Sequence, residues 1–259
     1  MANEGKLTGC VALVTGGGGA IGGAICHLYA GEGAKILVAD ARADAAASVA
    51  EEIGNAARPF DLDVSDPIQG AAAVDATVEA FGSLNVLVNV AATTTPDNSV
   101  EDLSLGDWNE AFAVNLTGPF LMSKFAVPQI RMAGGGSIVN IASQLGQIGV
   151  PNRSAYCTTK AALIHLTTIL ASEVAKDNIR VNSISPGVIQ TPRTLRRFDK
   201  IEEFQTSRGP LHMLGRVGQP EEVAKAALFL ASEDASFTTA TDILVDGGYI
   251  YLKRQPETK

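Results

Sequence analysis

The sequence is poor in aromatic residues, in cysteine and in long apolar runs. Aromatic side chains make up 5% of the 259 residues, too few to predict the stacking platforms that bind single-stranded nucleic acid. The three cysteines (Cys10, Cys26 and Cys157) lie far apart and form no Cys-x-x-Cys pair, so we expect no disulfide framework and no metal site. No apolar run approaches the roughly 18 residues of a membrane span, and the N-terminus lacks a basic and then apolar leader. These absences predict a soluble, cytoplasmic protein in a reducing compartment.

Basic side chains are also in deficit. The sequence has 20 Lys and Arg residues against 28 Asp and Glu residues, which gives a formal net charge of −8. This balance repels a phosphate backbone and disfavours nucleic-acid binding, although one helix N-terminus can still hold a small anionic cofactor. Apolar residues, at 46%, far exceed charged residues, at 19%. That composition is typical of a chain that buries a full core, and it excludes a disordered one.

Short apolar runs alternate along the chain with longer helical patterns. The runs are near-continuously apolar, as strands buried on both faces are, and their alternation with helices predicts parallel strands joined by right-handed crossovers. We therefore predict one α/β domain over residues 1–259, a Rossmann-type doubly wound parallel sheet of about seven strands with helices on both faces. The predicted strands are 10–15, 35–39, 58–62, 85–89, 137–141, 180–184 and 243–245, and the predicted helices are 21–32, 43–54, 67–81, 104–132, 155–176 and 220–232.

The 191–219 segment interrupts this alternation. It holds five Gly and Pro residues and a short amphipathic piece over 195–204, and its length predicts an insertion that covers a substrate. Its basic side chains, together with Arg153, leave open an anionic substrate and equally a solvated loop face. The last seven residues, 253–259, are predicted to form a polar tail.

A glycine-rich turn follows the first predicted strand directly. The sequence over 15–23, Thr-Gly-Gly-Gly-Gly-Ala-Ile-Gly-Gly, leads into a helix, and its glycines let a pyrophosphate approach the backbone at the helix N-terminus. The second strand ends at Asp40, 18 residues beyond Gly22, where a carboxylate can bind the adenine ribose and repel a 2′-phosphate. This spacing favours NAD over NADP, although Asp40 can also be a helix N-cap and Arg42 can oppose the preference.

Tyr156 and Lys160 are four residues apart and share one face of a predicted helix. A tyrosine has a pKa of about 10 and needs a nearby cation before it can act as an acid or base at neutral pH. Lys160 supplies that cation and can also reach a ribose. Together with the glycine turn, the pair indicates proton transfer beside a dinucleotide.

With these two motifs the chain resembles the short-chain dehydrogenase/reductase family, in its compact single-domain branch, over about residues 7–248. The family's Thr-Gly-x-x-x-Gly-x-Gly motif falls on Gly16, Ala20 and Gly22, with alanine in the second glycine position. Its Asn-Asn-Ala-Gly motif appears as Asn-Val-Ala-Ala over 89–92, which departs at Val90 and Ala92. The resemblance implies cofactor contacts from Gly16, Gly19, Ala20, Ile21, Gly22, Asp40, Asp63, Val64, Asn89, Ala91, Tyr156, Lys160, Pro186, Gly187 and Thr191.

The resemblance also implies four catalytic residues. Tyr156 is the general acid and base, Lys160 lowers its pKa, and Ser143 hydrogen-bonds the substrate oxygen. Asn115 holds a proton-relay water, but taken alone it is equally a polar helix residue satisfied by the backbone, and Ser143 is equally a turn residue. The substrate contacts implied by family position are Ser143, Gln144, Leu145, Val150, Asn152, Tyr156 and Val188.

These features predict an NAD-dependent oxidoreductase that interconverts a secondary alcohol and its ketone by hydride transfer. The resemblance implies a homotetramer or homodimer acting on a small molecule, and neither nucleic acid nor a membrane is an expected partner. A dinucleotide-binding sensor or scaffold without catalysis and a 3-oxoacyl-thioester reductase are the alternatives. An enoyl-thioester reductase is disfavoured, because that branch places six residues between the tyrosine and the lysine, against three here.

Overall fold

The computed structural model describes residues 5–252, so the predicted polar tail over 253–259 lies outside the described residues. Seven strands form one sheet in the order β3-β2-β1-β4-β5-β6-β7, and every neighbouring pair is parallel. The prediction of one Rossmann-type α/β domain is confirmed. The strands are β1 (Val11–Thr15), β2 (Lys35–Asp40), β3 (Ala57–Asp61), β4 (Val86–Asn89), β5 (Gly136–Ile141), β6 (Ile179–Pro186) and β7 (Asp242–Val245).

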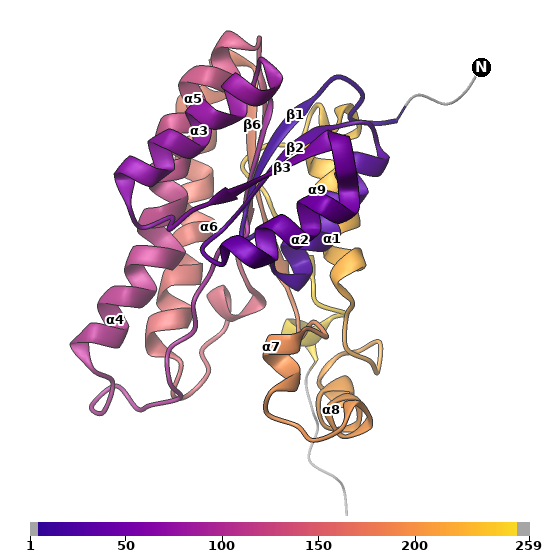
Figure 1. Ribbon diagram of the computed structural model, residues 1–259. Coiled ribbons are helices and arrows are strands. Elements are labelled where there is room, and N and C mark those ends of the chain that lie inside the picture. Colours follow the sequence, from indigo (N-terminus) through magenta and orange to yellow (C-terminus); the bar gives the residue numbers. More distant parts are fainter. Residues whose placement is uncertain (1–4, 253–259) are drawn as a thin grey trace, which may run out of the picture.

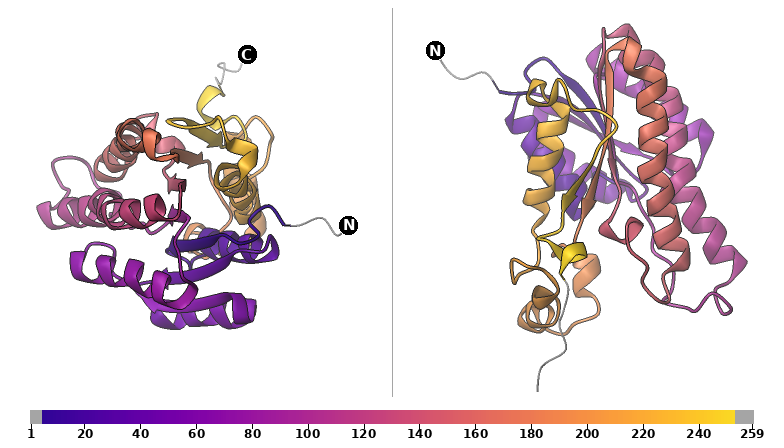
Figure 2. Two further views of the ribbon diagram at one scale, coloured as in Figure 1. Left: turned by 90° about the horizontal axis from the view of Figure 1, so that it is seen from above. Right: turned by 180° about the vertical axis from the view of Figure 1, so that it is seen from behind.

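Two layers of helices cover the sheet, one on each face, as Figures 1 and 2 show. Side chains point alternately to the two faces of a strand, so in β1 Ala12 and Val14 pack with one layer and Leu13 with the other. The first layer is α1 (Ala20–Gly31), α2 (Ala43–Ile53) and α9 (Pro220–Ala231), and the second is α3 (Pro67–Phe81), α5 (Gly118–Met132) and α6 (Ser154–Val174). Within residues 5–252, none of the helices combines the length and the apolar character that crossing a membrane requires.

A π-helical turn divides the predicted helix 104–132. α4 (Leu105–Phe112) ends there, the residues Ala113–Thr117 form the wide turn, and α5 begins at Gly118. The turn contains Asn115, whose side chain binds the backbone of Thr93 through two hydrogen bonds of 2.8 and 3.0 Å. Wide turns of this kind are frequent at functional sites. The prediction of one uninterrupted helix is wrong at this point.

The 191–219 segment contains two short helices rather than one amphipathic piece. α7 (Pro192–Leu195) begins at Thr191, whose hydroxyl accepts a hydrogen bond from the Thr194 N–H at 3.2 Å, and α8 (Ile201–Arg208) follows after five residues. The two ends of the segment meet, because the Gly218 N–H donates to the Val188 carbonyl at 2.9 Å and the Gly218 carbonyl accepts from Gln190 at 2.8 Å. Figure 1 shows both helices beyond the lower edge of the sheet.

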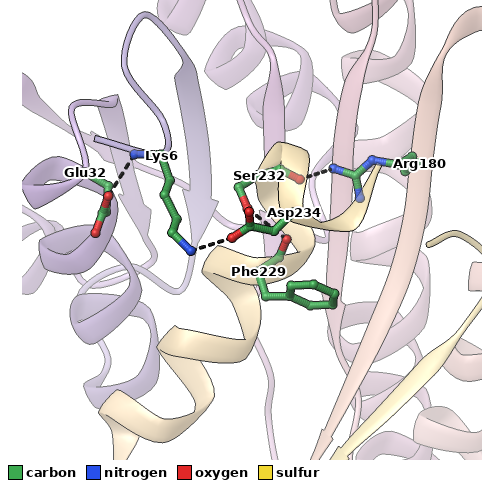
Figure 3. A network of polar contacts seen from close by, with 6 residues as sticks. All are labelled: Lys6, Glu32, Arg180, Phe229, Ser232 and Asp234. Atoms are coloured by element: carbon green, nitrogen blue, oxygen red, sulfur yellow. Dashed lines mark hydrogen bonds and ion pairs between the residues drawn. The ribbon is translucent and has the colours of Figure 1, made fainter. Parts of the chain in front are cut away.

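Side chains from distant parts of the chain anchor the carboxyl end of α9. Arg180 in β6 donates to the carbonyl of Leu230 at 2.7 Å and to the carbonyl of Ser232 at 3.1 Å. Figure 3 shows the Arg180 contact with Ser232 beside an ion pair between Lys6 and Asp234, which ties the N-terminal segment to the turn after α9. A helix leaves its last carbonyls without partners, so Arg180 satisfies groups that the helix itself cannot.

Arg180→Ala should lower the free energy of unfolding by about 1–3 kcal/mol, because two partly buried carbonyls lose a charged donor. Urea unfolding followed by circular dichroism measures the change. Arg131→Ala is the control, since Arg131 forms an ion pair of 2.7 Å with Asp177 at the surface, where ion pairs contribute little. Equal losses in the two variants would contradict the anchoring role of Arg180.

Candidate active site

The carboxyl ends of β1, β4 and β5 meet at one edge of the sheet. The strands pair in register there, with Thr15 beside Asn89 and Asn89 beside Asn140. Buried polar contacts cross the same edge: the Asn89 amide donates to the Asn140 side chain at 2.8 Å, and the Thr15 hydroxyl accepts from the N–H groups of Val90 and Ala91 at 3.1 and 3.3 Å. This edge therefore holds together the segments that carry the predicted site residues.

The glycine turn after β1 is too closely packed for side chains. Gly16 has a φ of +65°, and a Cβ on it would lie 2.8 Å from the backbone nitrogen of Ala91. A Cβ on Gly22 would lie 2.1 Å from the carbonyl oxygen of Gly16. Ala20, where the sequence departs from the family motif, is the first residue of α1. The turn thus keeps bare backbone at the edge of the sheet, which a ligand can approach closely.

The start of α1 fits the pyrophosphate of a nicotinamide dinucleotide. α1 has 12 residues, and its N-cap is Gly19, which has no side chain to cap the first N–H groups of the helix. Those N–H groups, from Ala20 and Ile21 onward, point outward at the positive end of the helix dipole. Free donors in this position bind phosphate. The residues predicted to hold the cofactor are therefore chemically suited to it.

Asp40 lies at the end of β2, beside the glycine turn. Its carboxylate is 8% exposed and accepts hydrogen bonds from the backbone N–H groups of Gly18 and Arg42, both at 3.0 Å. The Arg42 Nε lies 3.5 Å from the same carboxylate, and the guanidinium also donates to the Gly18 carbonyl at 3.2 Å. The N-cap of α2 is Arg42, so Asp40 does not have the capping role that the sequence left open. Its carboxylate holds the turn and Arg42 instead.

The other predicted cofactor residues lie along the same edge. Asp63 follows β3 and is exposed, with its carboxylate bound by the N–H and the hydroxyl of Ser65 at 2.9 and 2.7 Å. Val64 is buried in the core. At the far end, Pro186 is the last residue of β6, and Thr191 begins α7. The predicted contacts thus extend from β3 to the exit of β6.

Tyr156 and Ser143 meet although they come from different elements. Ser143 follows β5, and its hydroxyl accepts from the Leu145 N–H at 3.1 Å. Tyr156 lies in the first turn of α6, where its hydroxyl interacts with the Ser143 side chain. Burial raises the pKa of Tyr156 above its usual value, while Ser143 and the charges of Arg193 and Arg153 act in the opposite direction. The site therefore partly offsets the cost of ionising a buried phenol.

Lys160 lies one helical turn after Tyr156 and is 2% exposed. Its Nζ donates to the Ile141 carbonyl at 2.8 Å and lies 5.8 Å from the ring centre of Tyr156. Burial lowers the pKa of Lys160 to about 7, and the nearby Arg193 acts in the same direction. Lys160 therefore loses its proton more readily than a solvated lysine, whose pKa is about 10.4.

Asn115 joins the segment after β4 to α6. Its side chain is fully buried, and both ends of the amide bind the backbone of Thr93, as the alternative interpretation of the sequence anticipated. The same amide group lies 3.3 Å from the hydroxyl of Thr159, the residue before Lys160. Asn115 thus holds the start of α6 against the loop that follows β4.

The predicted substrate residues surround Ser143 and Tyr156 in the sequence but differ in their environment. Gln144 is buried, and among the described residues its Oε1 has no hydrogen-bond partner. Asn152 is exposed with a φ of +63°. The Val188 N–H donates to Nε2 of His212 at 3.2 Å. The contact between Val188 and His212 could not be predicted from the sequence, because the two residues are 24 positions apart and no local motif marks the contact.

Comparison with a family model agrees with this geometry. The model is described as Enoyl-(Acyl carrier protein) reductase, and it matches residues 18–250. The match begins inside the glycine turn and runs through all the residues of α6 and the 191–219 segment. It therefore covers the Tyr156–Lys160 pair and the part of the glycine motif from Gly18 onward.

Curated relatives match nearly the whole chain. A cyclohexanol dehydrogenase from Acinetobacter sp. (strain SE19) is 40% identical over 247 residues, which cover 94% of this chain and 96% of the relative. A 3-alpha-(or 20-beta)-hydroxysteroid dehydrogenase from Mycobacterium bovis is 41% identical over 249 residues, 95% of this chain and 92% of the relative. A 3-oxoacyl-(acyl-carrier-protein) reductase from Thermotoga maritima is 38% identical over 248 residues, 95% of this chain and 99% of the relative. With this likeness over its length, the chain belongs to the short-chain dehydrogenase/reductase family of oxidoreductases.

Proposed function

We propose that the protein is an NAD-dependent oxidoreductase that interconverts a secondary alcohol and its ketone. The observation that carries this proposal is the meeting of Ser143, Tyr156 and Lys160 at the sheet edge that also carries the glycine turn. A protein that only senses or binds a dinucleotide has no need of a buried lysine and a serine beside a tyrosine. The arrangement therefore favours catalysis over binding alone.

Tyr156 exchanges a proton with the reacting oxygen. In oxidation its ionised hydroxyl takes the proton of the alcohol, and in ketone reduction its neutral hydroxyl returns that proton. Ser143, whose side chain acts on the pKa of Tyr156, donates to the same oxygen and fixes its position. Asn115 keeps the start of α6 in place for this exchange through its contacts with Thr93 and Thr159.

Positive charge around Tyr156 favours its ionised form. Lys160 contributes when it is protonated, and Arg193 lowers the pKa of Tyr156 from the 191–219 segment. Nicotinamide dinucleotide, when bound, supplies the hydride acceptor or donor, and its oxidised ring adds a further positive charge. Since burial alone opposes the phenolate, Tyr156 ionises readily only when these charges act together.

The preference for NAD rests on Asp40. Its nearly buried carboxylate lies beside the glycine turn and carries a negative charge where the adenine ribose is expected to bind. A 2′-phosphate placed there would be repelled. Arg42 opposes this effect only in part, because its guanidinium is already paired with Asp40 and with the Gly18 carbonyl.

A neutral alcohol is the proposed substrate class. Two of the relatives are named for cyclohexanol and for hydroxysteroids, which are uncharged secondary alcohols. In this proposal the 191–219 segment covers the substrate, which binds beside Ser143 and Tyr156. The residues proposed to line the pocket are Gln144, Leu145, Val150, Asn152 and Val188.

We also propose that the protein is a homotetramer or homodimer in a reducing, cytoplasmic compartment. An apolar depression between α5 and α6 supports self-association, since Phe120 and Ile169 at its rim are 45% and 43% exposed and large apolar side chains gather at protein contacts. The three free cysteines are compatible with a reducing environment. The depression is lined by Leu116, Thr117, Phe120, Ala162, His165, Leu166 and Ile169.

A 3-oxoacyl-thioester reductase is the second candidate. The relative from Thermotoga maritima carries that activity in its name and matches 95% of this chain. Reduction of acetoacetyl-coenzyme A with NADPH, compared with oxidation of cyclohexanol with NAD, separates the two. A kcat/KM at least tenfold higher for the thioester would overturn the alcohol dehydrogenase proposal.

Tyr156→Phe should lower kcat for cyclohexanol by about 10²–10⁴-fold, because the variant cannot accept the alcohol proton. NADH fluorescence on binding should stay near that of the wild type. Tyr251→Phe is the control, since Tyr251 is 66% exposed and lies outside the proposed site. Turnover near the wild-type value in Tyr156→Phe would refute the role of this residue.

Asp40→Asn should lower the ratio of kcat/KM for NAD to that for NADP by about tenfold or more, because the charge that repels a 2′-phosphate is lost and Arg42 is released. Asp44→Asn removes an equal charge from the exposed first turn of α2 and should leave the ratio unchanged. Steady-state kinetics with both cofactors measures it. The preference does not depend on Asp40 if both variants behave alike.

Between about pH 7.5 and 9.5 the cofactor-free wild type should gain stability relative to Lys160→Met, by up to about 1.4 kcal/mol per pH unit. The folded protein loses the Lys160 proton near its pKa of about 7, whereas the unfolded chain keeps it to about pH 10.4. The unfolded state thus binds more protons, so stability rises with pH. Urea unfolding at several pH values gives the slope of the unfolding free energy against pH for the wild type and for Lys160→Met. Equal slopes would show that the folded protein does not depress the pKa of Lys160.

A further inference from the structure

Asp97 binds two arginines from distant parts of the chain. Its carboxylate lies 2.9 Å from Nη2 of Arg153 and 2.6 Å from Nη1 of Arg197. The three side chains are only partly exposed, at 37% for Asp97, 21% for Arg153 and 51% for Arg197. The two ion pairs hold the pKa of Asp97 below its usual value, with the Arg197 hydrogen bond as the largest cause. We call this group the Asp97 clasp.

The clasp joins the three segments that surround the proposed substrate. Asp97 lies in the loop after β4, Arg197 lies between α7 and α8 in the 191–219 segment, and Arg153 is the N-cap of α6. Arg153 is three residues before Tyr156, and its charge acts on the pKa of that tyrosine. The position of the 191–219 segment is thereby coupled to the first turn of the catalytic helix.

A second contact joins the 191–219 segment to the loop after β4. Nη2 of Arg193 in α7 donates to the carbonyl of Ala92, directly after β4, at 3.0 Å. Arg193 and Arg197 are four residues apart, so both bind the loop over 92–97 from the same part of the segment. Ala92 is the position where the sequence departs from the family's glycine, and its carbonyl here receives a side chain from the 191–219 segment.

Without Asp97 the same residues would repel one another. Arg153 and Arg197 would then face each other without a counter-ion, and Arg208 acts on the Asp97 carboxylate from the same side. Like charges at such distances disfavour the closed arrangement. Asp97 therefore converts a repulsive contact between the 191–219 segment and α6 into an attractive one.

We propose that Asp97 is a positioning residue that closes the 191–219 segment over the substrate and sets the mouth of the pocket for an uncharged alcohol. This inference rests on the proposed function for the identity of the substrate. Arg153 and Arg197 both pair with Asp97, which neutralises one of their two charges, so they attract a carboxylate or phosphate less than two unpaired arginines would. The anionic substrate that the arginine content of the sequence left open is disfavoured for this reason.

Limited proteolysis tests the closure without any substrate. Trypsin cleaves after the basic residues of the segment, and Asp97→Asn should raise the rate of cleavage within 193–208 by about three- to tenfold while circular dichroism stays unchanged. Asp102→Asn is the matched control, since Asp102 is an exposed acid of the same loop, and within residues 5–252 its hydrogen bonds join it to Ser99, three residues before it. Equal cleavage rates in the two variants would overturn the proposal.

Kinetics with cyclohexanol and NAD tests the effect on the pocket. Asp97→Asn should raise KM for cyclohexanol about three- to tenfold and change kcat less than twofold, because Ser143, Tyr156 and Lys160 are intact. Asp97→Glu, which keeps the charge, should restore part of the loss, and about 0.5 M NaCl should raise the wild-type KM toward that of Asp97→Asn. An unchanged KM, or a loss confined to kcat, would overturn the positioning role.

The two experiments separate this inference from the proposed function. If the wild type turns over neither cyclohexanol nor other secondary alcohols, the proposed function fails, and the proteolysis result still decides whether Asp97 closes the segment. If the wild type is active but Asp97→Asn matches Asp102→Asn in both assays, the clasp fails and the proposed function stands.

Discussion

Parallel pairing of β1, β4 and β5 in one register is the constraint on which the site depends. It sets Thr15, Asn89 and Asn140 side by side at the edge of the sheet, and all three side chains are buried. Buried polar groups need partners, and the Asn89 amide nitrogen and the Thr15 hydroxyl find them across the strands and in the segment after β4, whereas Oδ1 of Asn89 has none among the described residues. A slip of one residue would turn these side chains to the opposite face of the sheet and away from their present partners. The register in this way fixes the positions of the strand ends along the edge of the sheet, and of the turns that follow them.

The same burial sets the electrostatic character of Lys160 and Tyr156. Lys160 reaches the carbonyl of Ile141 with 2% of its surface exposed, and Tyr156 is held against Ser143, so removal from water disfavours the charged form of each. A fold selected for stability alone would place apolar residues here. Groups whose ionisation the fold resists are characteristic of active sites, because small changes in nearby charge then decide their protonation.

The parallel sheet and the motifs could be predicted from the sequence, since the signals for both are local patterns. Apolar runs, the glycine turn and the Tyr156–Lys160 spacing each lie within a few residues, and strand pairing followed from their alternation. The π-helical turn could not be predicted, because the partner of Asn115 is Thr93, 22 residues away. The role of Asp97 could not be predicted either, because its partners Arg153 and Arg197 lie 56 and 100 residues further along the chain. Contacts that close loops over a site depend on the fold and leave no local pattern.

The meeting of Val188 and Gln190 with Gly218 has a consequence for how such a protein changes over evolution. The two ends of the 191–219 segment are hydrogen-bonded to each other. The positions where the segment leaves and rejoins the rest of the fold therefore do not depend on the residues between them. Residues can be inserted or exchanged in the segment without displacing β6 or α9. Doubling the length of the segment costs only about 0.6 kcal/mol of loop-closure free energy. The 191–219 segment is thus free to vary while the edge of the sheet that carries Ser143, Tyr156 and Lys160 stays unchanged.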